Sequence, residues 1–104
     1  MARFDIYRNP TAVERADTPF VLDIQNDYLG PIATRVVIPL RNPLGFGRPA
    51  HGLNPLFDVQ GTPVVLDTAA LAPVLASMLK HPVWRAESWR DEVLDALDTL
   101  FGAY

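Results

Sequence analysis

Proline, glycine and asparagine interrupt this chain at strand-length intervals, and that spacing constrains its fold more than any other feature. Ten prolines and six glycines are spread over the 104 residues. A proline inside an α-helix removes a backbone hydrogen bond and clashes with the preceding turn. Between the interruptions lie short runs rich in β-branched and aromatic side chains, which favour β-strands. The chain therefore predicts a structure of many short strands.

Alternation of apolar and other side chains with a period of two residues locates several of the strands. Pro39 lies inside one such run and has no N–H to donate, so we expect it at a sheet edge, a bulge or a strand end. Residues 60–63 read Gln-Gly-Thr-Pro between two apolar runs, which predicts a β-hairpin with a glycine-containing turn. The predicted strands are residues 3–7, 20–25, 35–40, 56–59 and 64–66.

Two later segments are less regular. Residues 41–55 contain three prolines and three glycines and predict a long loop. In residues 68–81 apolar side chains fall at helical spacing, but Pro73 fits poorly in a helix interior. A strand through residues 71–75 followed by a short helical turn fits the same segment, and the residues alone leave both alternatives open.

The last segment has clear helical periodicity. Ser88 to Asp91 resembles a capping box, with Asp in place of the usual Glu or Gln, and Gly102 is placed to end the helix. Asp91, Asp95 and Asp98 fall on the face opposite the apolar stripe. The stripe consists of Trp89, Val93, Ala96, Leu97, Leu100 and Phe101.

These elements predict a mostly β fold with one long C-terminal α-helix, arranged as a small β-barrel or a bent antiparallel sheet. A length of 104 residues is that of one domain, so we expect residues 1–104 to form a single domain. The apolar fraction of 49% and the charged fraction of 20% exclude a chain that is disordered throughout.

Charge and cysteine content narrow the classes of function. Nine basic and twelve acidic residues give a net charge of −3, and no basic stripe is present, which disfavours binding to nucleic acid through its phosphates. A neutral or basic protein partner fits this charge better. The absence of cysteine excludes disulfides and thiolate chemistry. We expect a soluble cytoplasmic protein with no membrane partner, since there is no signal-peptide pattern and no apolar run of about 20 residues.

No motif indicates a catalytic, metal or cofactor site. His51 and His81 lack metal-ligand spacing, and the Gly-Phe-Gly segment matches neither a phosphate-binding nor a dinucleotide-binding motif. His51 with Arg41 and Arg48 is a candidate for a small basic loop site. The residues alone therefore favour a small β-rich binding domain, and we expect no catalytic residue, no metal ligand and no cofactor.

Several segments, taken in order, resemble one known family. Residues 3–7 are similar to its first strand, and residues 54–59 and 71–74 are similar to later ones. The most specific segments are Asp-Ile-Gln-Asn-Asp at 23–27 and Val-Val-Ile-Pro-Leu at 36–40. They are similar to the family's Asp-Val-Gln-Ser-Asp and Arg-x-Val-Ile-Pro-Leu. Over nearly its whole length, the chain resembles the CcdB family of toxins from type II toxin–antitoxin modules.

The resemblance implies a small SH3-like barrel with a long terminal helix, and it favours the strand at residues 71–75. It implies a homodimer whose helices lie near the two-fold axis, with Leu97, Leu100 and Phe101 at the interface. It implies binding to the A subunit of DNA gyrase, which traps the enzyme on cleaved DNA without catalysis by the toxin. A cognate antitoxin would release gyrase, and the toxin–antitoxin complex would bind operator DNA and repress its own operon.

The resemblance also implies where gyrase is bound. In the family the last residues, typically Phe-Trp-Gly-Ile, make the contact, and this chain ends Phe-Gly-Ala-Tyr at 101–104. Either alignment of the two endings leaves the indole missing. Tyr28 and Leu29 match two isoleucines in a turn that faces gyrase, and Asp98 matches an asparagine of the helix. The implied gyrase-binding residues are Asn26, Tyr28, Leu29, Asp98, Phe101, Gly102, Ala103 and Tyr104.

Two alternatives remain open. A MazF-like endoribonuclease would share the scaffold and would need a basic cleft holding a general acid and base, for which the candidates are Arg35, Arg41, Arg48 and His51. A retargeted or degenerate family member would bind only an antitoxin, and the altered C-terminal residues support that alternative.

Overall fold

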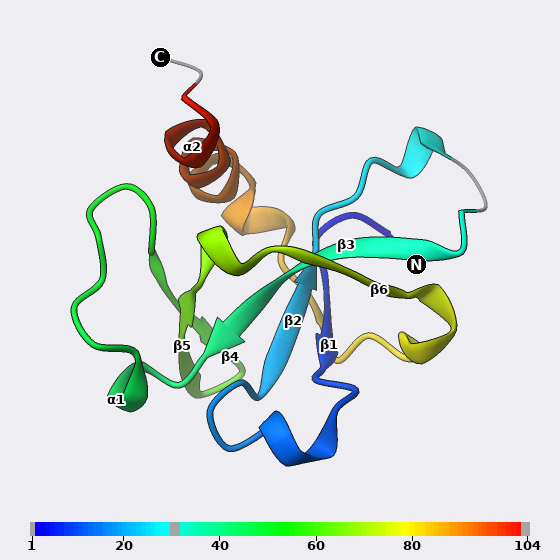
Figure 1. The fold of residues 1–104 in the computed structure, drawn as a ribbon, viewed down its shortest axis with the longest axis horizontal. Coiled ribbons are helices and arrows are strands. Elements are labelled where there is room, and N and C mark those ends of the chain that lie inside the picture. The colour runs from blue at the N-terminus through cyan, green and yellow to red at the C-terminus, as the bar shows by residue number, and fades with distance from the viewer. Residues whose placement is uncertain (1, 30–31, 103–104) are drawn as a thin grey trace.

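The computed structural model describes residues 2–29 and 32–102, which form one bent antiparallel sheet and a C-terminal helix (Figure 1). Within that part of the chain the α-helices are α1 (Pro43–Phe46) and α2 (Arg90–Phe101), and short 3-10 turns connect several strands. The strands are β1 (Asp5–Arg8), β2 (Phe20–Asp23), β3 (Thr34–Arg41), β4 (Leu56–Val59), β5 (Thr62–Leu66), β6 (Ala72–Leu75) and β7 (Trp84–Arg85).

The longest strand, β3, organises the sheet. The strand order is β4-β5-β3-β2-β1-β7, and β6 also pairs with β3. Along one edge of β3, residues 34–37 pair with β6 and residues 40–41 pair with β5. Because one strand serves two neighbours on the same side, the sheet curls into a nearly closed barrel. The predicted mostly β barrel with one terminal helix is confirmed, and so is the strand at residues 71–75.

Pro39 lies in the interior of β3. Of the three positions expected for it, a sheet edge, a bulge or a strand end, the strand end is therefore wrong. Its carbonyl oxygen accepts from the N–H of Asp67 at 3.0 Å, on the side that faces β6 and β5. Pro39 therefore sits between the last residue paired with β6 and the first paired with β5. A proline is tolerated there because its missing N–H falls where the neighbouring strand changes from β6 to β5, outside the paired residues of both.

The predicted hairpin is confirmed, with a turn shorter than the four residues of 60–63. Gln60 and Gly61 both have positive φ, at 50° and 95°, as a two-residue type I′ turn requires. The N–H of Gly61 donates to Oδ1 of Asp58 at 2.6 Å. That turn brings β4 against β5 in register.

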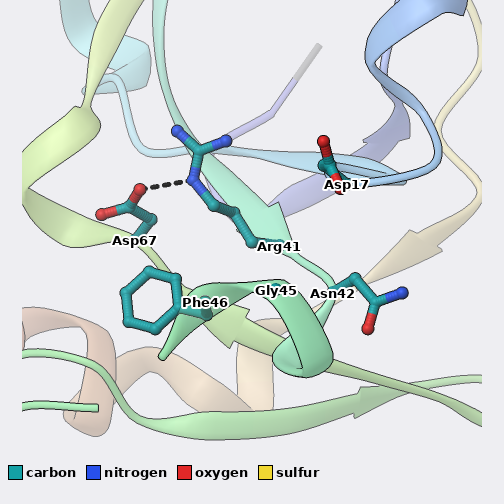
Figure 2. Close-up of a pocket in the computed structure, with 6 residues that line it drawn as sticks. All are labelled: Asp17, Arg41, Asn42, Gly45, Phe46 and Asp67. Carbon is teal, nitrogen blue, oxygen red and sulfur yellow. Dashed lines mark hydrogen bonds and ion pairs between the residues drawn. The ribbon is translucent and has the colours of Figure 1, made fainter. Parts of the chain in front are cut away.

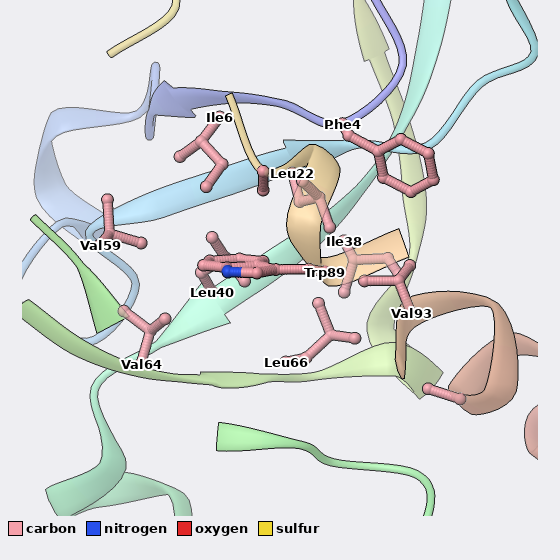
Figure 3. Close-up of a cluster of buried hydrophobic side chains, with 12 residues drawn as sticks. Phe4, Ile6, Leu22, Ile38, Leu40, Val59, Val64, Leu66, Trp89 and Val93 are labelled. Carbon is pink, nitrogen blue, oxygen red and sulfur yellow. The ribbon is translucent and has the colours of Figure 1, made fainter. Parts of the chain in front are cut away.

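The main core lies inside the barrel and is closed by the start of the terminal helix (Figure 3). The Trp89 ring stacks on Phe57 with centroids 4.0 Å apart and planes 6° from parallel. Val93 and Ala96 are fully buried on the next turns of α2. The remaining labelled side chains of the core are Phe4, Ile6, Leu22, Ile38, Leu40, Val59, Val64 and Leu66.

A second, smaller cluster lies on the opposite face of the sheet. It consists of Tyr7, Val21, Val37 and Leu79. Strands β1 and β2 are therefore buried on both faces, where the alternation in the sequence suggested one apolar and one more polar face. The segment around η4 (Ala76–Met78) supplies this cover, which alternation within β1 and β2 cannot report.

The sequence predicted the C-terminal end of α2 correctly and its N-terminal end incorrectly. The predicted capping box at Ser88 is wrong: Ser88 lies within a 3-10 turn, η5 (Glu87–Trp89), and no side chain caps the helix. Burial of Trp89 in the core decides where the helix begins. Gly102 ends the helix as predicted, with φ 74° and ψ 40°, and its N–H donates to the Asp98 carbonyl at 2.9 Å.

Residues 41–55 are more regular than the predicted loop. Asn42 caps the short helix α1 by accepting from the N–H of Leu44 at 3.0 Å, and Pro43 occupies its first turn. Near the C-terminal end of the segment, Nδ2 of Asn54 donates to the carbonyl of Leu66 at 3.1 Å and attaches the segment to β5. No helix among the described residues is long and apolar enough to cross a lipid bilayer.

We predict that Trp89→Ala lowers the free energy of unfolding by about 3–5 kcal/mol, because it removes the ring that joins α2 to the barrel and leaves a cavity. Urea unfolding followed by circular dichroism measures this. Leu44→Ala, at a side chain 94% exposed, serves as the control and should change stability by less than about 0.5 kcal/mol. An equal loss in both variants would contradict this account of the core.

Because Tyr7 is buried, we predict that the protein loses stability at alkaline pH. Burial, and then the nearby carboxylates of Asp5 and Asp23, raise the pKa of Tyr7 from 10.0 to about 12. The folded protein therefore keeps this proton at pH values where the unfolded chain releases it, so stability falls as the pH rises from about 10 to about 12. Urea unfolding across this range should show a smaller decline in Tyr7→Phe than in the unsubstituted protein.

Candidate partner-binding surfaces

The turn after β2 presents two apolar side chains to solvent. Oδ1 of Asn26 accepts from the N–H of Tyr28 at 2.9 Å, and the Asn26 carbonyl accepts from the N–H of Leu29 at 3.2 Å. These bonds form the 3-10 turn η2 (Asp27–Leu29). With its amides satisfied locally, the turn projects Tyr28, which is 97% exposed, and Leu29, which is 55% exposed.

A buried arginine of β3 holds this turn in place. Nε of Arg35 donates to Oδ2 of Asp23 at 2.8 Å, and its Nη2 donates to Oδ1 of the same carboxylate at 2.9 Å. Nη2 also reaches Oδ1 of Asp27 at 3.2 Å. Both Arg35 and Asp23 are buried. One guanidinium therefore ties the end of β2 to the first residue of η2.

Asp27 is also tied to the N-terminal segment. Its two carboxylate oxygens accept from the N–H of Arg3 at 3.0 and 3.2 Å. Nε of Arg3 in turn donates to the carbonyl of Ile24 at 3.1 Å. The hydrogen bonding from the Arg3 amide, and then the hydrogen bond and positive charge of Arg35, lower the pKa of Asp27 below its ordinary value. The carboxylate of Asp27 therefore stays ionised at a lower pH than an ordinary aspartate does.

The end of α2 forms the other surface implied by the sequence. The inner face of the helix is buried at Val93 and Ala96, whereas Leu97, Asp98 and Leu100 are half-buried. Leu97 also packs partly against the main core. Phe101 is 70% exposed, and Gly102 is exposed as well. Ala103 and Tyr104 lie outside the described residues.

The structure does not bring these two surfaces together within one chain. In Figure 1 the η2 turn and the C-terminal end of α2 lie on opposite sides of the upper part of the molecule. Asn26, Tyr28 and Leu29 therefore form one group, and Asp98, Phe101 and Gly102 form another.

The arginine proposed for a basic loop site is already paired. Nε of Arg41 donates to Oδ2 of Asp67 at 2.5 Å, and its Nη1 donates to Oγ1 of Thr18 at 2.8 Å (Figure 2). The pocket around it has a volume of about 380 Å³, and Asp17 is a second carboxylate in its lining. With two carboxylates and one guanidinium in its lining, this pocket has no net positive charge.

The other candidates for an endoribonuclease site lie elsewhere. His51 lines a separate pocket with Glu92 and Asp95, and Arg35 is buried in its ion pair. The four candidate side chains therefore do not form one basic cleft. In residues 2–29 and 32–102 there is also no group of three or more His, Asp or Glu side chains able to hold a metal ion.

The role of Arg35 was not predicted from the sequence, although the sequence contains a signal for it. Asp23 pairs directly with Val37 across β2 and β3, so Arg35 is its diagonal neighbour on the same face of the sheet. When one apolar strand ends in an aspartate and the next strand, antiparallel to it, begins with an arginine, the pattern predicts an ion pair between the two side chains.

The chain is similar to a known protein family. The family model described as CcdB protein matches residues 3–102. That range contains Asp23, Asp27 and Arg35, both candidate surfaces and the helix as far as Gly102. No curated protein sequence matches the chain significantly.

We predict that Arg35→Gln lowers the free energy of unfolding by about 3–5 kcal/mol, because it leaves the carboxylate of Asp23 buried and unpaired. Asp27→Asn is the matched variant on the exposed side of the same network and should cost less than about 1 kcal/mol. Urea unfolding at neutral pH separates the two. A loss below about 1 kcal/mol in Arg35→Gln would contradict the importance of the buried pair.

Proposed function

The chain belongs to the CcdB family and is a toxin of the toxin–antitoxin type, and from that premise we propose that it binds the A subunit of DNA gyrase and traps gyrase on cleaved DNA. It acts by binding, without catalysis of its own. A cognate antitoxin neutralises it, and the complex of the two binds operator DNA. Its place of action is the cytoplasm, where its target is found. Residues 1–104 act as a single CcdB-like toxin domain.

The observation that carries this proposal is the exposure of Tyr28 on a turn that is held rigidly. A tyrosine that is 97% exposed gains nothing for the fold of the isolated chain. Aromatic side chains contribute disproportionately to protein interfaces, and a preorganised one loses little entropy on binding. The hydrogen bonds of Asp27 to Arg3 and Arg35 supply that preorganisation. We assign Asn26, Tyr28 and Leu29 to the gyrase-binding surface.

The end of α2 is a second, separate surface that we assign to gyrase. Phe101 is 70% exposed, and Asp98 and Gly102 lie beside it in the sequence. The family's usual tryptophan is absent from this ending, so Phe101 and Tyr28 provide the aromatic contact instead. Ala103 and Tyr104 complete the contact at the chain end.

The helix α2 also provides the dimer interface. Leu97 and Leu100 are half-buried apolar side chains on the last turns of the helix, and Phe101 follows them. Burial of such side chains against a second copy removes apolar surface from water. Dimerisation would also place the C-terminal ends of two helices close to one another, so that one gyrase dimer meets both.

The charge of α2 favours a basic surface on gyrase. Asp91, Glu92, Asp95 and Asp98 give the helix four carboxylates in its twelve residues, against Arg90 alone. Charge complementarity of this kind raises association rates and selects among partners. The substitution of aspartate for the family's asparagine at Asp98 adds to this selectivity.

We predict that the purified protein, with gyrase, ATP and supercoiled DNA, gives trapped double-strand breaks. Removal of residues 102–104 should abolish trapping, and Tyr28→Ala should weaken it by about tenfold or more, as expected for an interface aromatic. Leu44→Ala is the control, because Leu44 is equally exposed but lies on α1, outside both surfaces.

The outcome that contradicts gyrase poisoning is an absence of trapping by a protein shown to be folded and dimeric. If the same protein still binds an antitoxin, the chain is a retargeted family member. RNA cleavage that is lost in Arg41→Ala or His51→Ala would instead favour the endoribonuclease.

A further inference from the structure

A pocket of about 250 Å³ lies between the η2 turn and the first residue of α2. Its lining brings together the residues before β1, the η2 turn, and the segment that leads from β7 into α2. Three guanidinium groups against two carboxylates give this lining a net positive charge. We refer to it as the arginine pocket; it is lined by Tyr28, by Arg3, Arg85 and Arg90, and by Asp27 and Glu87.

Both carboxylates of the arginine pocket are already paired. Oδ1 of Asp27 accepts from Nη2 of the buried arginine of β3 at 3.2 Å. Oε2 of Glu87 accepts from Nη2 of Arg85 at 2.9 Å. None of the ion pairs among the described residues includes Arg3 or Arg90. Two guanidinium groups of one pocket therefore lack a carboxylate partner, and an anionic group from a ligand would remove their mutual repulsion.

One aromatic ring holds these two guanidinium groups. Cζ of Arg3 lies 5.2 Å from the centroid of the Phe4 ring, and Cζ of Arg90 lies 5.6 Å from it. A cation at this distance over an aromatic face is attracted by the electron density of the ring. Nε of Arg3 also donates to the carbonyl of Ile24 at 3.1 Å, which fixes that side chain and leaves its terminal nitrogens for a ligand.

The ring itself is held by a strained backbone. Phe4 has φ 71°, in the left-handed region that residues other than glycine rarely adopt. Its N–H donates to the carbonyl of Asp23 at 2.7 Å, and its carbonyl accepts from the N–H of Ala86 at 2.8 Å. These bonds, and burial of the side chain to 1% exposure, maintain the strained conformation. A ligand therefore meets guanidinium groups that are already in place, which lowers the entropic cost of binding.

We propose that the arginine pocket binds the carboxylate of an acidic side chain on the protein that also contacts Tyr28. Arg90 makes the principal contact, with Arg3 beside it, because the planar guanidinium matches a carboxylate through two parallel hydrogen bonds. This inference rests on the proposed function, in which the protein bound at Tyr28 is the A subunit of gyrase. It makes Arg90 a residue that determines which A subunits the toxin recognises.

The charges of α2 support an acidic group at this place on the partner. Arg90 is the only basic residue of α2 and lies at its first position, whereas the last carboxylate, Asp98, lies near the other end. A complementary partner is therefore acidic opposite the beginning of the helix and basic opposite its end. A nucleic-acid phosphate fits less well, because phosphate-driven binding uses several cations along a backbone, and the arginine pocket offers two.

The test measures the affinity of the purified A subunit of gyrase for the protein, without DNA, by biolayer interferometry. Arg90→Gln should weaken binding about fivefold or more, and Arg90→Glu about thirtyfold or more, because the reversed charge repels the carboxylate of the partner. A glutamate in the first turn of a helix is favourable, so circular dichroism should show α2 intact. The matched controls are Arg8→Gln and Arg8→Glu, at an exposed residue of β1 outside the pocket, and each should leave the affinity within about twofold.

Three outcomes would overturn this proposal while leaving gyrase binding in place. Binding that is unchanged or tighter in Arg90→Glu would mean that the beginning of α2 faces no acidic group. Equal weakening in the Arg8 variants would assign the effect to net charge. Weakening that appears only when the A subunit carries DNA would identify a phosphate contact. If the unsubstituted protein does not bind the A subunit at all, the proposed function itself fails, and this inference fails with it.

Discussion

The joint burial of Arg35 and Asp23 is the interaction on which much of this structure depends. A carboxylate or a guanidinium leaves water at a cost of several kcal/mol unless the two are paired and well hydrogen-bonded. A slip of one residue between β2 and β3 would send one partner to the other face of the sheet, so the pair selects the register. The same guanidinium reaches Asp27. The register of the sheet and the position of the turn that carries Tyr28 are therefore set together.

Sequence patterns predicted those parts of the fold that depend on neighbours along the chain. The turn at Gln60–Gly61 and the end of α2 at Gly102 follow from local backbone requirements. The capping box at Ser88 failed because burial of Trp89, a long-range effect, decides where the helix begins. The burial of Val21 depends on a segment that covers the second face of the sheet from far along the chain. Alternation within one strand carries no information about such cover.

The candidate binding surfaces could be predicted from the sequence to different degrees. The exposure of Tyr28 and Phe101 agrees with positions that the family resemblance picked out, although their contact with gyrase is still a prediction. Arg35 was grouped with Arg41 as a candidate for an RNA cleft, but both are engaged in ion pairs. The sequence did not predict that Arg8, Arg15 and Lys80 line one pocket, because net charge is a sum over the whole chain. That pocket forms only because the barrel brings residues 8–15 next to residues 77–81.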